Sequence, residues 1–327
     1  IRLNGGDPDK IPEIHTLSLP LYSKACRTSS YDIIISNKKQ LEETPIPEGS
    51  YLCENEQYSE YVIGILAGNF YRQGRAINFL DVFNFTSCDE DDGLGVSQYI
   101  FMEKIDNTLT NILKCVDERS TTSTLIQTLF ALAFLQTYKI NHNDLHLGNV
   151  FVEYITEETK FNGQTLHDAD YFHYSVNGKD IYFPMSPFLI KLGDFGLSIK
   201  WKTPIVGNKN VVDGDFGSLI PRWYSPHYDF LYFVTQFFKL SRNKYPFLTK
   251  LTAWTLRGQK SLRETKEENL NSIKLKLGAF FEDEYDRPLL NVVDKFDAIP
   301  MDILMNDDLM KGFLTKPDGK IVTLGRI

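Results

Sequence analysis

The stretch that decides the fold is His142-Asn-Asp-Leu-His-Leu-Gly-Asn-Val150, and Lys191-Leu-Gly-Asp-Phe-Gly-Leu-Ser198 follows it further along the chain. Phosphoryl transfer requires a carboxylate that orients the attacking hydroxyl, oxygen ligands for Mg²⁺, and positive charge that offsets the phosphates. Asp144 can be that carboxylate. Asn149 and Asp194 can supply the metal ligands, because hard Mg²⁺ prefers oxygen. The two stretches together therefore indicate phosphoryl-transfer chemistry.

The composition is that of a globular protein with one large or two ordinary domains. The chain has 327 residues, of which 42% are hydrophobic and 24% are charged, and these values argue against global disorder. The formal net charge of −8 argues against a general nucleic-acid-binding protein, which usually carries a basic excess, although a local basic patch stays open. We therefore expect no nucleic-acid partner. No feature of the sequence specifies an oligomeric state.

Cysteine usage and hydropathy indicate a reducing compartment and no membrane span. The cysteines Cys26, Cys53, Cys88 and Cys115 lie far apart and form no CxxC pair, so we predict neither a zinc site nor a disulfide framework. No apolar run approaches the ~18 residues that a membrane-spanning helix needs. The chain begins at Ile1 with neither a signal-peptide pattern nor an initiator Met, so a fragment of a longer chain is one interpretation.

Hydrophobic patterning predicts an α+β chain whose halves differ in character. In the first half we expect a strand at Tyr31–Ile35, a helix over residues 54–72, and a hairpin of Ile77–Phe85 and Val96–Met102 around the turn Asp89–Gly95. The pattern changes near Met102–Asn107, which places the boundary between residues 1–104 and 105–327.

The second half is expected to be mostly helical. We predict helices at Thr110–Val116, Thr122–Tyr138, Tyr228–Leu240 and 258–276, a polar loop over residues 153–180, and short strands at Lys179–Phe183 and Phe188–Leu192. The helices Thr122–Tyr138 and Tyr228–Leu240 are apolar on most sides, which predicts that both are buried.

The two motifs resemble those of the protein-kinase superfamily. His142, Asp144 and Asn149, five positions after the Asp, match the H-R-D-x-x-x-x-N catalytic loop, and Asp194-Phe-Gly196 matches D-F-G. A predicted buried helix precedes the first motif and an apolar strand precedes the second. The form HxDLHxGN is closer to haspin-like and small-molecule-kinase loops than to HRDLKPxN. His146 stands where most Ser/Thr kinases have Lys.

The resemblance extends outward from the motifs and covers about residues 20–290. Glu60 resembles the ion-pair glutamate of helix αC, with Glu56 as the alternative one turn earlier. Met102 stands at the gatekeeper position before the hinge. The resemblance implies that backbone groups from Glu103 to Ile105 contact the adenine of ATP.

Features of the second half also resemble the family. Arg222-Trp-Tyr-Ser-Pro226 is similar to the W-Y-x-A-P-E stretch, Asp229 resembles the αF aspartate that braces the catalytic loop, and Asp286-Arg-Pro288 resembles a late Arg-Pro. The haspin-like loop, the long insert before D-F-G and the short link from Pro226 to Asp229 are similar to divergent Ser/Thr kinases of large DNA viruses. That resemblance implies a cytoplasmic location in a host cell, or a place in the virus particle.

Two parts of the family pattern are missing. Residues 15–22, where the glycine-rich phosphate loop should lie, contain no glycine, and without small residues a backbone cannot approach phosphates closely. Ser36 falls where the lysine of strand β3 is expected. Lys38 would lie on the same face of a strand, so it is taken as the substitute, with Lys24 and Lys39 as the next candidates.

The two histidines of the first motif have structural interpretations. His142 is expected to pack and hydrogen-bond within the loop, and His146 to be a loop histidine with its own hydrogen bond. Their spacing could suggest a metal pair, but the stretch lacks the glutamate of HExxH and has the character of a loop, so we predict no zinc site there.

The resemblance implies a two-lobed, protein-kinase-like fold with a β-rich N-lobe (residues 1–104), a helical C-lobe (residues 105–327), and ATP between them. Asp144 would orient a Ser or Thr hydroxyl of a protein substrate, while Asn149 and Asp194 hold Mg²⁺. The missing glycine loop and the displaced lysine leave two alternatives open. One is an inactive pseudokinase that acts as a binding or scaffold module, and the other is a small-molecule kinase.

Overall fold

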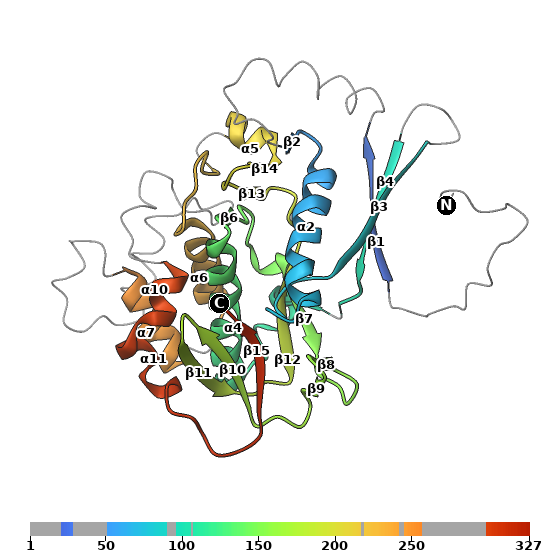
Figure 1. Cartoon of the computed structure of the whole chain (residues 1–327). Helices are drawn as coiled ribbons and strands as arrows, with labels where there is room; N and C mark the ends of the chain where they lie inside the picture. The colour runs from blue at the N-terminus through green and yellow to red at the C-terminus, as the bar shows by residue number, and fades with distance from the viewer. Residues whose placement is uncertain are drawn as a thin grey trace, which may run out of the picture.

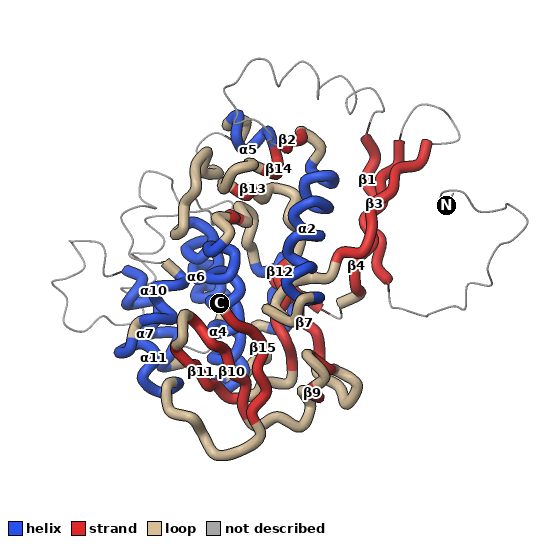
Figure 2. The backbone as a smooth tube through the Cα atoms, in the orientation of Figure 1, coloured by secondary structure: helices blue, strands red, loops and turns tan. Residues whose placement is uncertain are grey.

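The computed structural model of the chain describes residues 21–28, 51–89, 96–105, 107–216, 219–241, 245–256 and 299–327. Small sheets and several helices follow one another along this part of the chain (Figure 1; Figure 2), which confirms the α+β prediction. Several predictions lie outside the described residues, namely the strand Tyr31–Ile35, the turn at 90–95, the helix 258–276 and the Asp286–Pro288 resemblance.

The first sheet has the strand order β1-β4-β3, with β1 at Leu21–Thr28, β3 at Val82–Asp89 and β4 at Val96–Glu103. Both pairings are antiparallel, so the predicted pairing of two neighbouring strands is confirmed. The strand β3 begins at Val82 and not at Ile77, because the residues before it pair elsewhere. The amide of Ile77 donates to the carbonyl of Leu324 at 3.1 Å, and that of Leu80 donates to Leu192 at 3.0 Å.

Helix α2 (Glu56–Arg72) confirms the helix predicted over residues 54–72. The side chain of Asn55 accepts a hydrogen bond from the amide of Tyr58 at 2.9 Å, which satisfies one of the unpaired N–H groups of the first turn. The helix buries Ile63 and Ala67 completely and packs against β3 and β4. Figure 1 shows α2 beside the first sheet.

Three further sheets contain strands that lie far apart in the sequence. The first is β12-β7-β5, built from β5 (Asn107–Thr108), β7 (Val150–Tyr154) and β12 (Phe188–Leu192). The second is β11-β10-β15, built from β10 (Tyr171–Val176), β11 (Lys179–Pro184) and β15 (Ile321–Arg326). The third is β2-β14-β13-β6, built from β2 (Tyr51–Cys53), β6 (Ile140–Asn141), β13 (Ile199–Lys200) and β14 (Val206–Asn208).

The part of the chain after residue 105 contains more strand than the mostly helical prediction allowed. The strands predicted near β11 and β12 are confirmed. The loop predicted over residues 153–180 is wrong, because it contains β10 and the short hairpin of β8 (Lys160–Phe161) and β9 (Gln164–Thr165). Alternate residues of β10 are buried, which is the pattern of a strand with one covered face. Its parallel partner is the distant β15.

Helices α4 (Glu118–Thr137) and α6 (Tyr228–Leu240) form the helical part of the core and confirm the two predicted buried helices. The helix α4 begins before Thr122, because the carboxylate of Asp117 accepts a hydrogen bond from the amide of Ser120 at 2.7 Å. It packs against β11, β12, α6, α7 (Pro246–Leu256) and α10 (Pro300–Met305). Its Phe130 and Phe134 are fully buried, and each such ring stabilises the fold by about 1.5–3 kcal/mol.

The remaining helices among the described residues are short. They are α3 (Leu109–Ile112), α5 (Lys209–Asp213) and α11 (Asp307–Met310), with 3₁₀ turns at Leu147–Asn149 and Lys311–Phe313. The single turn α3 lies where a slightly longer helix was predicted. Within the described ranges, none of the helices has the length and apolarity that crossing a membrane would require.

Candidate functional site

Two pairs of strands hold the two sequence motifs side by side. The strands β6 and β7 flank the first motif, and β12 and β13 flank the second. Leu192 of β12 is the register partner of Val150 of β7, and Ile199 of β13 is the partner of Asn141 of β6. The loops 142–149 and 193–198 therefore span the same two strand pairs in opposite directions, which places them side by side.

A buried carboxylate fixes the start of the first loop. Asp229 lies in the first turn of α6 and is 5% exposed. Its Oδ2 accepts the backbone N–H of His142 at 2.8 Å, and its Oδ1 accepts that of Asn143 at 2.7 Å. Burial raises the pKa of the Asp229 carboxyl, against the opposing effects of His142 and of these donors. The predicted brace between Asp229 and the catalytic-loop motif is confirmed as a hydrogen-bonded contact.

His142 hydrogen-bonds within its loop, as predicted, since its Nδ1 accepts the Asp144 N–H at 3.4 Å, and it also connects the two motifs. It is fully buried, its Nε2 lies 2.9 Å from the carbonyl oxygen of Gly193, and its ring lies 5.0 Å from that of Phe195. The hydroxyl of Ser198 donates to the His142 carbonyl at 3.0 Å. A carbonyl oxygen only accepts, so His142 Nε2 is the donor in the Gly193 contact.

Asp144 and Asn149 meet within the first loop. The side-chain nitrogen Nδ2 of Asn149 donates to the backbone carbonyl of Asp144 at 2.9 Å and lies 3.5 Å from the Asp144 Oδ2. His146 Nε2 lies 3.7 Å from the same carboxylate oxygen, and His146 Nδ1 accepts the Gly148 N–H at 3.0 Å. The Asp144 side chain is 23% exposed, so it is held in place while remaining open to solvent.

Asp194 is placed near Asp144 and Asn149 by a backbone contact of the preceding residue, Gly193. The amide of Gly193 donates to the carbonyl of Asn149 at 3.4 Å. Asp194 and Asn143 adopt left-handed backbone conformations, with φ of 61° and 66°. Such conformations are uncommon for residues other than glycine, and strain of this kind concentrates at functional sites. The structure thus brings the predicted trio Asp144, Asn149 and Asp194 into one region.

The donor chemistry fits Mg²⁺. The side-chain amide nitrogen of Asn149 donates to Asp144, so the side-chain oxygen of Asn149 is the atom that would meet a metal, and the carboxylate of Asp194 would be the second protein ligand. Both are the hard oxygen ligands that Mg²⁺ prefers. Across the part of the chain that the structure describes, no group of three or more His, Cys, Asp or Glu side chains could hold a metal ion. A Mg²⁺ ion here would therefore need water and substrate phosphates as additional ligands.

Both αC-like glutamates lie on α2, in different surroundings. Glu60 is 3% exposed and faces the interior. Glu56 lies one turn earlier, and a Cβ atom added to Gly196 would stand 2.6 Å from its Cγ and 2.8 Å from its Oε1. Glu56 is thus the glutamate that packs directly on the glycine of D-F-G. The space at Gly196 leaves no room for a side chain unless Glu56 moves.

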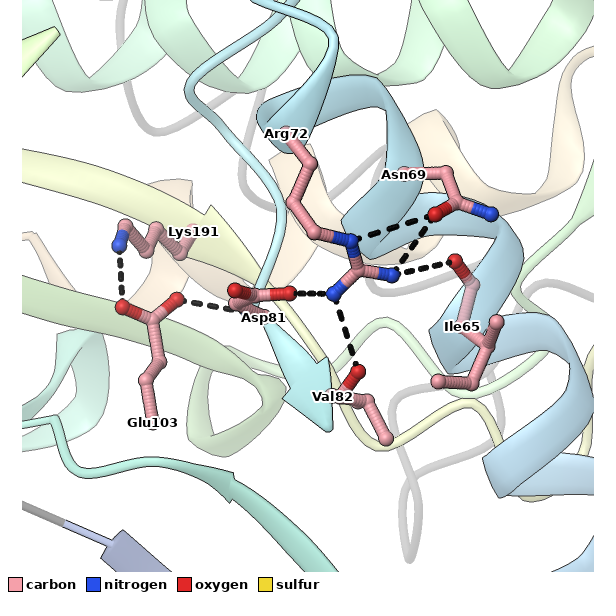
Figure 3. A network of polar contacts seen from close by, with 7 residues as sticks. All are labelled: Ile65, Asn69, Arg72, Asp81, Val82, Glu103 and Lys191. Carbon is pink, nitrogen blue, oxygen red and sulfur yellow. Dashed lines mark hydrogen bonds and ion pairs between the residues drawn. The ribbon is translucent and has the colours of Figure 1, made fainter. Parts of the chain in front are cut away.

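The expected adenine-contacting segment follows the end of β4. Met102 is 5% exposed in a small apolar cluster with Leu80, Val82 and Ile100, and Ile105 packs against this cluster. The side chain of Glu103 extends to Lys191 and not into open space, with Oε2 at 2.6 Å from Nζ (Figure 3). Only the backbone of Glu103 was expected to take part in the site, and this contact of its carboxylate was not predicted.

The three candidates for the phosphate-contacting lysine lie in different parts of the chain. Lys38 and Lys39 lie outside the described residues. Lys24 lies on β1, the strand that pairs with β4, and is the register partner of Ile100. Lys24 is thus the candidate that the structure places on a strand hydrogen-bonded to β4, the strand that ends at Glu103.

Sequence reasoning missed residues that act through contacts between distant segments. The Asn143 side chain donates to the Leu197 carbonyl at 2.8 Å, and Asn141 exchanges hydrogen bonds with the backbone of Ser225. Lys191 is buried although it is a lysine. The position of Asn143 beside Asp144, in a loop that needs a left-handed residue, was the available signal, since Asn adopts that conformation more easily than most residues.

The chain matches no model of a known protein family, and a comparison with curated proteins finds no relative. Its function is therefore argued from the geometry of the two motifs.

We expect Asp229→Asn to destabilise the protein, because an asparagine can accept with only one of its two side-chain atoms and leaves a buried N–H of the loop without an acceptor. The free energy of unfolding should fall by about 1–3 kcal/mol, measured by urea denaturation. The matched control is Asp307→Asn, whose carboxylate pairs with Lys179 at 2.7 Å and is 85% exposed. That variant should change the same quantity by less than about 1 kcal/mol. Equal effects of the two substitutions would contradict the assignment of Asp229 as the brace.

Proposed function

We propose that this chain transfers the γ-phosphoryl group of ATP to a Ser or Thr hydroxyl of a protein substrate, within a two-lobed, protein-kinase-like fold. The observation that carries the proposal is the convergence of Asp144, Asn149 and Asp194 on two loops clamped by paired strands. A carboxylate next to an amide oxygen and a second carboxylate is the arrangement that phosphoryl transfer requires. The resemblance of both motifs to kinase motifs supports the same conclusion.

The reaction is an in-line displacement at phosphorus. The hydroxyl oxygen of the substrate forms a bond to the γ-phosphorus while the bond from that phosphorus to the β–γ bridging oxygen breaks, and ADP leaves with the electron pair. Asp144 orients the hydroxyl and accepts its proton. Asn149 supports this role by holding the Asp144 backbone and side chain. Positioning and charge stabilisation account for most of the rate in this class of reaction.

Mg²⁺ would be held by Asn149 and Asp194, and when bound it neutralises phosphate charge. The 103–105 segment would contact adenine through its backbone groups. The buried apolar cluster at Met102 anchors that segment to the sheet, because Ile105 packs against it. Glu56 and Glu60 on α2 are the two candidates for pairing with the phosphate-contacting lysine.

We expect Asp144→Asn to lower the rate of transfer by about 10²–10⁴-fold, the range that general acid–base catalysis contributes. Asp194→Asn should abolish Mg²⁺-dependent transfer, because it removes the carboxylate ligand. The assay measures transfer from labelled ATP to casein, myelin basic protein and the chain itself. Asp168→Asn is the control, since that carboxylate is exposed and pairs with Lys320 at 3.2 Å, and it should retain wild-type transfer.

The same assay separates the alternatives. Transfer to small alcohols and not to proteins would indicate a small-molecule kinase. A folded wild-type protein that transfers nothing and shows no ATP-dependent thermal shift would contradict the enzymatic proposal and favour the scaffold.

Lys24 is expected to be the phosphate-contacting lysine, on the basis of the pairing of β1 with β4. Lys24→Ala should reduce kcat/KM for ATP by about 10–100-fold, the loss expected when one charge-assisted hydrogen bond of about 1.5–3 kcal/mol is removed. Lys38→Ala is the matched comparison and should have a much smaller effect. The reverse order, with Lys38→Ala the more damaging substitution, would restore the interpretation made from the sequence.

A further inference from the structure

Lys191 is a fully buried lysine at the junction of several elements. It lies on β12, its side chain is 2% exposed, and its Nζ lies 2.6 Å from Glu103 Oε2 and 2.8 Å from Glu153 Oε2. The ring of Tyr71, from the last turn of α2, lies 5.0 Å from the same ammonium. Three elements distant in sequence thus supply the partners of one side chain.

The charges of this cluster are not balanced one to one. A single ammonium serves two carboxylates, those of Glu103 and Glu153. Burial alone would lower the pKa of Lys191, but the two carboxylates outweigh burial and raise it, so the lysine stays protonated. Burial raises the pKa of Glu103, and Lys191 only partly offsets this.

Glu103 is held at both its side chain and its backbone. Its Oε1 accepts the amide N–H of Asp81 at 2.7 Å, and its own amide donates to the Asp81 carbonyl at 2.9 Å. The Asp81 carboxylate in turn pairs with Arg72 of α2. Figure 3 shows the resulting chain of contacts from Lys191 through Glu103 and Asp81 to Arg72.

Lys191 and Glu103 belong to two different segments of the candidate site. Glu103 is the last residue of β4 and the first of the segment expected to contact adenine. Lys191 lies on the strand that runs into Gly193 and Asp194. A shift of one segment relative to the other would separate the buried Lys191 ammonium from a largely covered carboxylate, and leaving a buried charge unpaired is unfavourable.

We propose that Lys191 and Glu103 are positioning residues that hold the base-contacting segment 103–105 in a fixed place relative to the strand that carries Asp194. The proposal rests on the proposed function, and it adds that the base of ATP and the carboxylate metal ligand are aligned through this ion pair. Neither residue touches the reacting atoms. Their effect on the reaction is exerted through the geometry of nucleotide binding.

Glu153 provides a matched comparison inside the same cluster. Its carboxylate lies at nearly the same distance from Nζ as that of Glu103, and the two side chains are 28% and 19% exposed. Glu153 lies on β7, however, and not on the segment that would meet the base. Glu103→Gln and Glu153→Gln therefore each remove one negative charge that pairs with Lys191. Only the Glu103 contact holds the 103–105 segment.

The test compares these two variants in the full chain, with Mg²⁺ and a non-hydrolysable ATP analogue titrated by calorimetry. We expect Glu103→Gln to raise the dissociation constant of the nucleotide by about tenfold, and Glu153→Gln to raise it by less than about twofold. Thermal melting of both variants serves as the control for folding and should show similar shifts. Equal effects on nucleotide affinity, or no effect of either substitution, would overturn the positioning role and leave the cluster purely structural.

A second measurement keeps this inference separate from the proposed function. Amide hydrogen exchange is followed at residues 103–105 and 192–194 in the same variants without nucleotide. Glu103→Gln should reduce protection in both segments, whereas Glu153→Gln should leave 103–105 unchanged. If the wild type binds no nucleotide but the exchange pattern holds, the proposed function fails and the mechanical link stands. Unchanged protection in Glu103→Gln would refute the link itself.

Discussion

The buried carboxylate of Asp229 is the contact on which the candidate site depends. It accepts the backbone N–H groups of His142 and Asn143 immediately before Asp144, so the backbone that leads into Asp144 is anchored to α6. That helix is apolar and buried over most of its length, which gives the carboxylate a rigid support. A buried anion is costly unless donors surround it, and here the donors belong to the loop itself.

The second constraint is the pairing of strands around both loops. With β7 on β12 and β6 on β13, neither loop can move without breaking a ladder, and the left-handed residues Asn143 and Asp194 persist because their surroundings over-determine them. The sheet that contains β6 and β13 continues through β14 to β2, directly before α2. The helix with Glu56 is thereby connected to the same framework, and Glu56 packs on Gly196.

Part of the fold and of the candidate site could be predicted from patterns of neighbouring residues in the sequence. The apolar helices α4 and α6 and the strand β12 lie in contiguous stretches with a self-contained pattern, and each of the two motifs that contain Asp144, Asn149 and Asp194 is a short local stretch. The rest depends on partners far apart in sequence. The strand β10 was missed although it forms a local hairpin with β11 across Asn177-Gly178, and only its other partner, β15, is distant. The stretch of β1 has no alternating apolar pattern, so nothing local raised Lys24 above Lys38. A lysine is usually exposed, so burial of Lys191 could not be expected from the sequence, and only the fold brings Glu103 and Glu153 to it.

The central claim is that Asn149 and Asp194 form a Mg²⁺-dependent nucleotide site with Asp144 beside it. The most direct measurement is calorimetric titration of the wild-type chain with a non-hydrolysable ATP analogue, with Mg²⁺ and then with the metal chelated. The account predicts saturable binding of one nucleotide that is markedly tighter with Mg²⁺, and loss of that metal dependence in Asp194→Asn. A folded wild-type chain that binds no nucleotide, or binds it equally with and without Mg²⁺, would contradict the account.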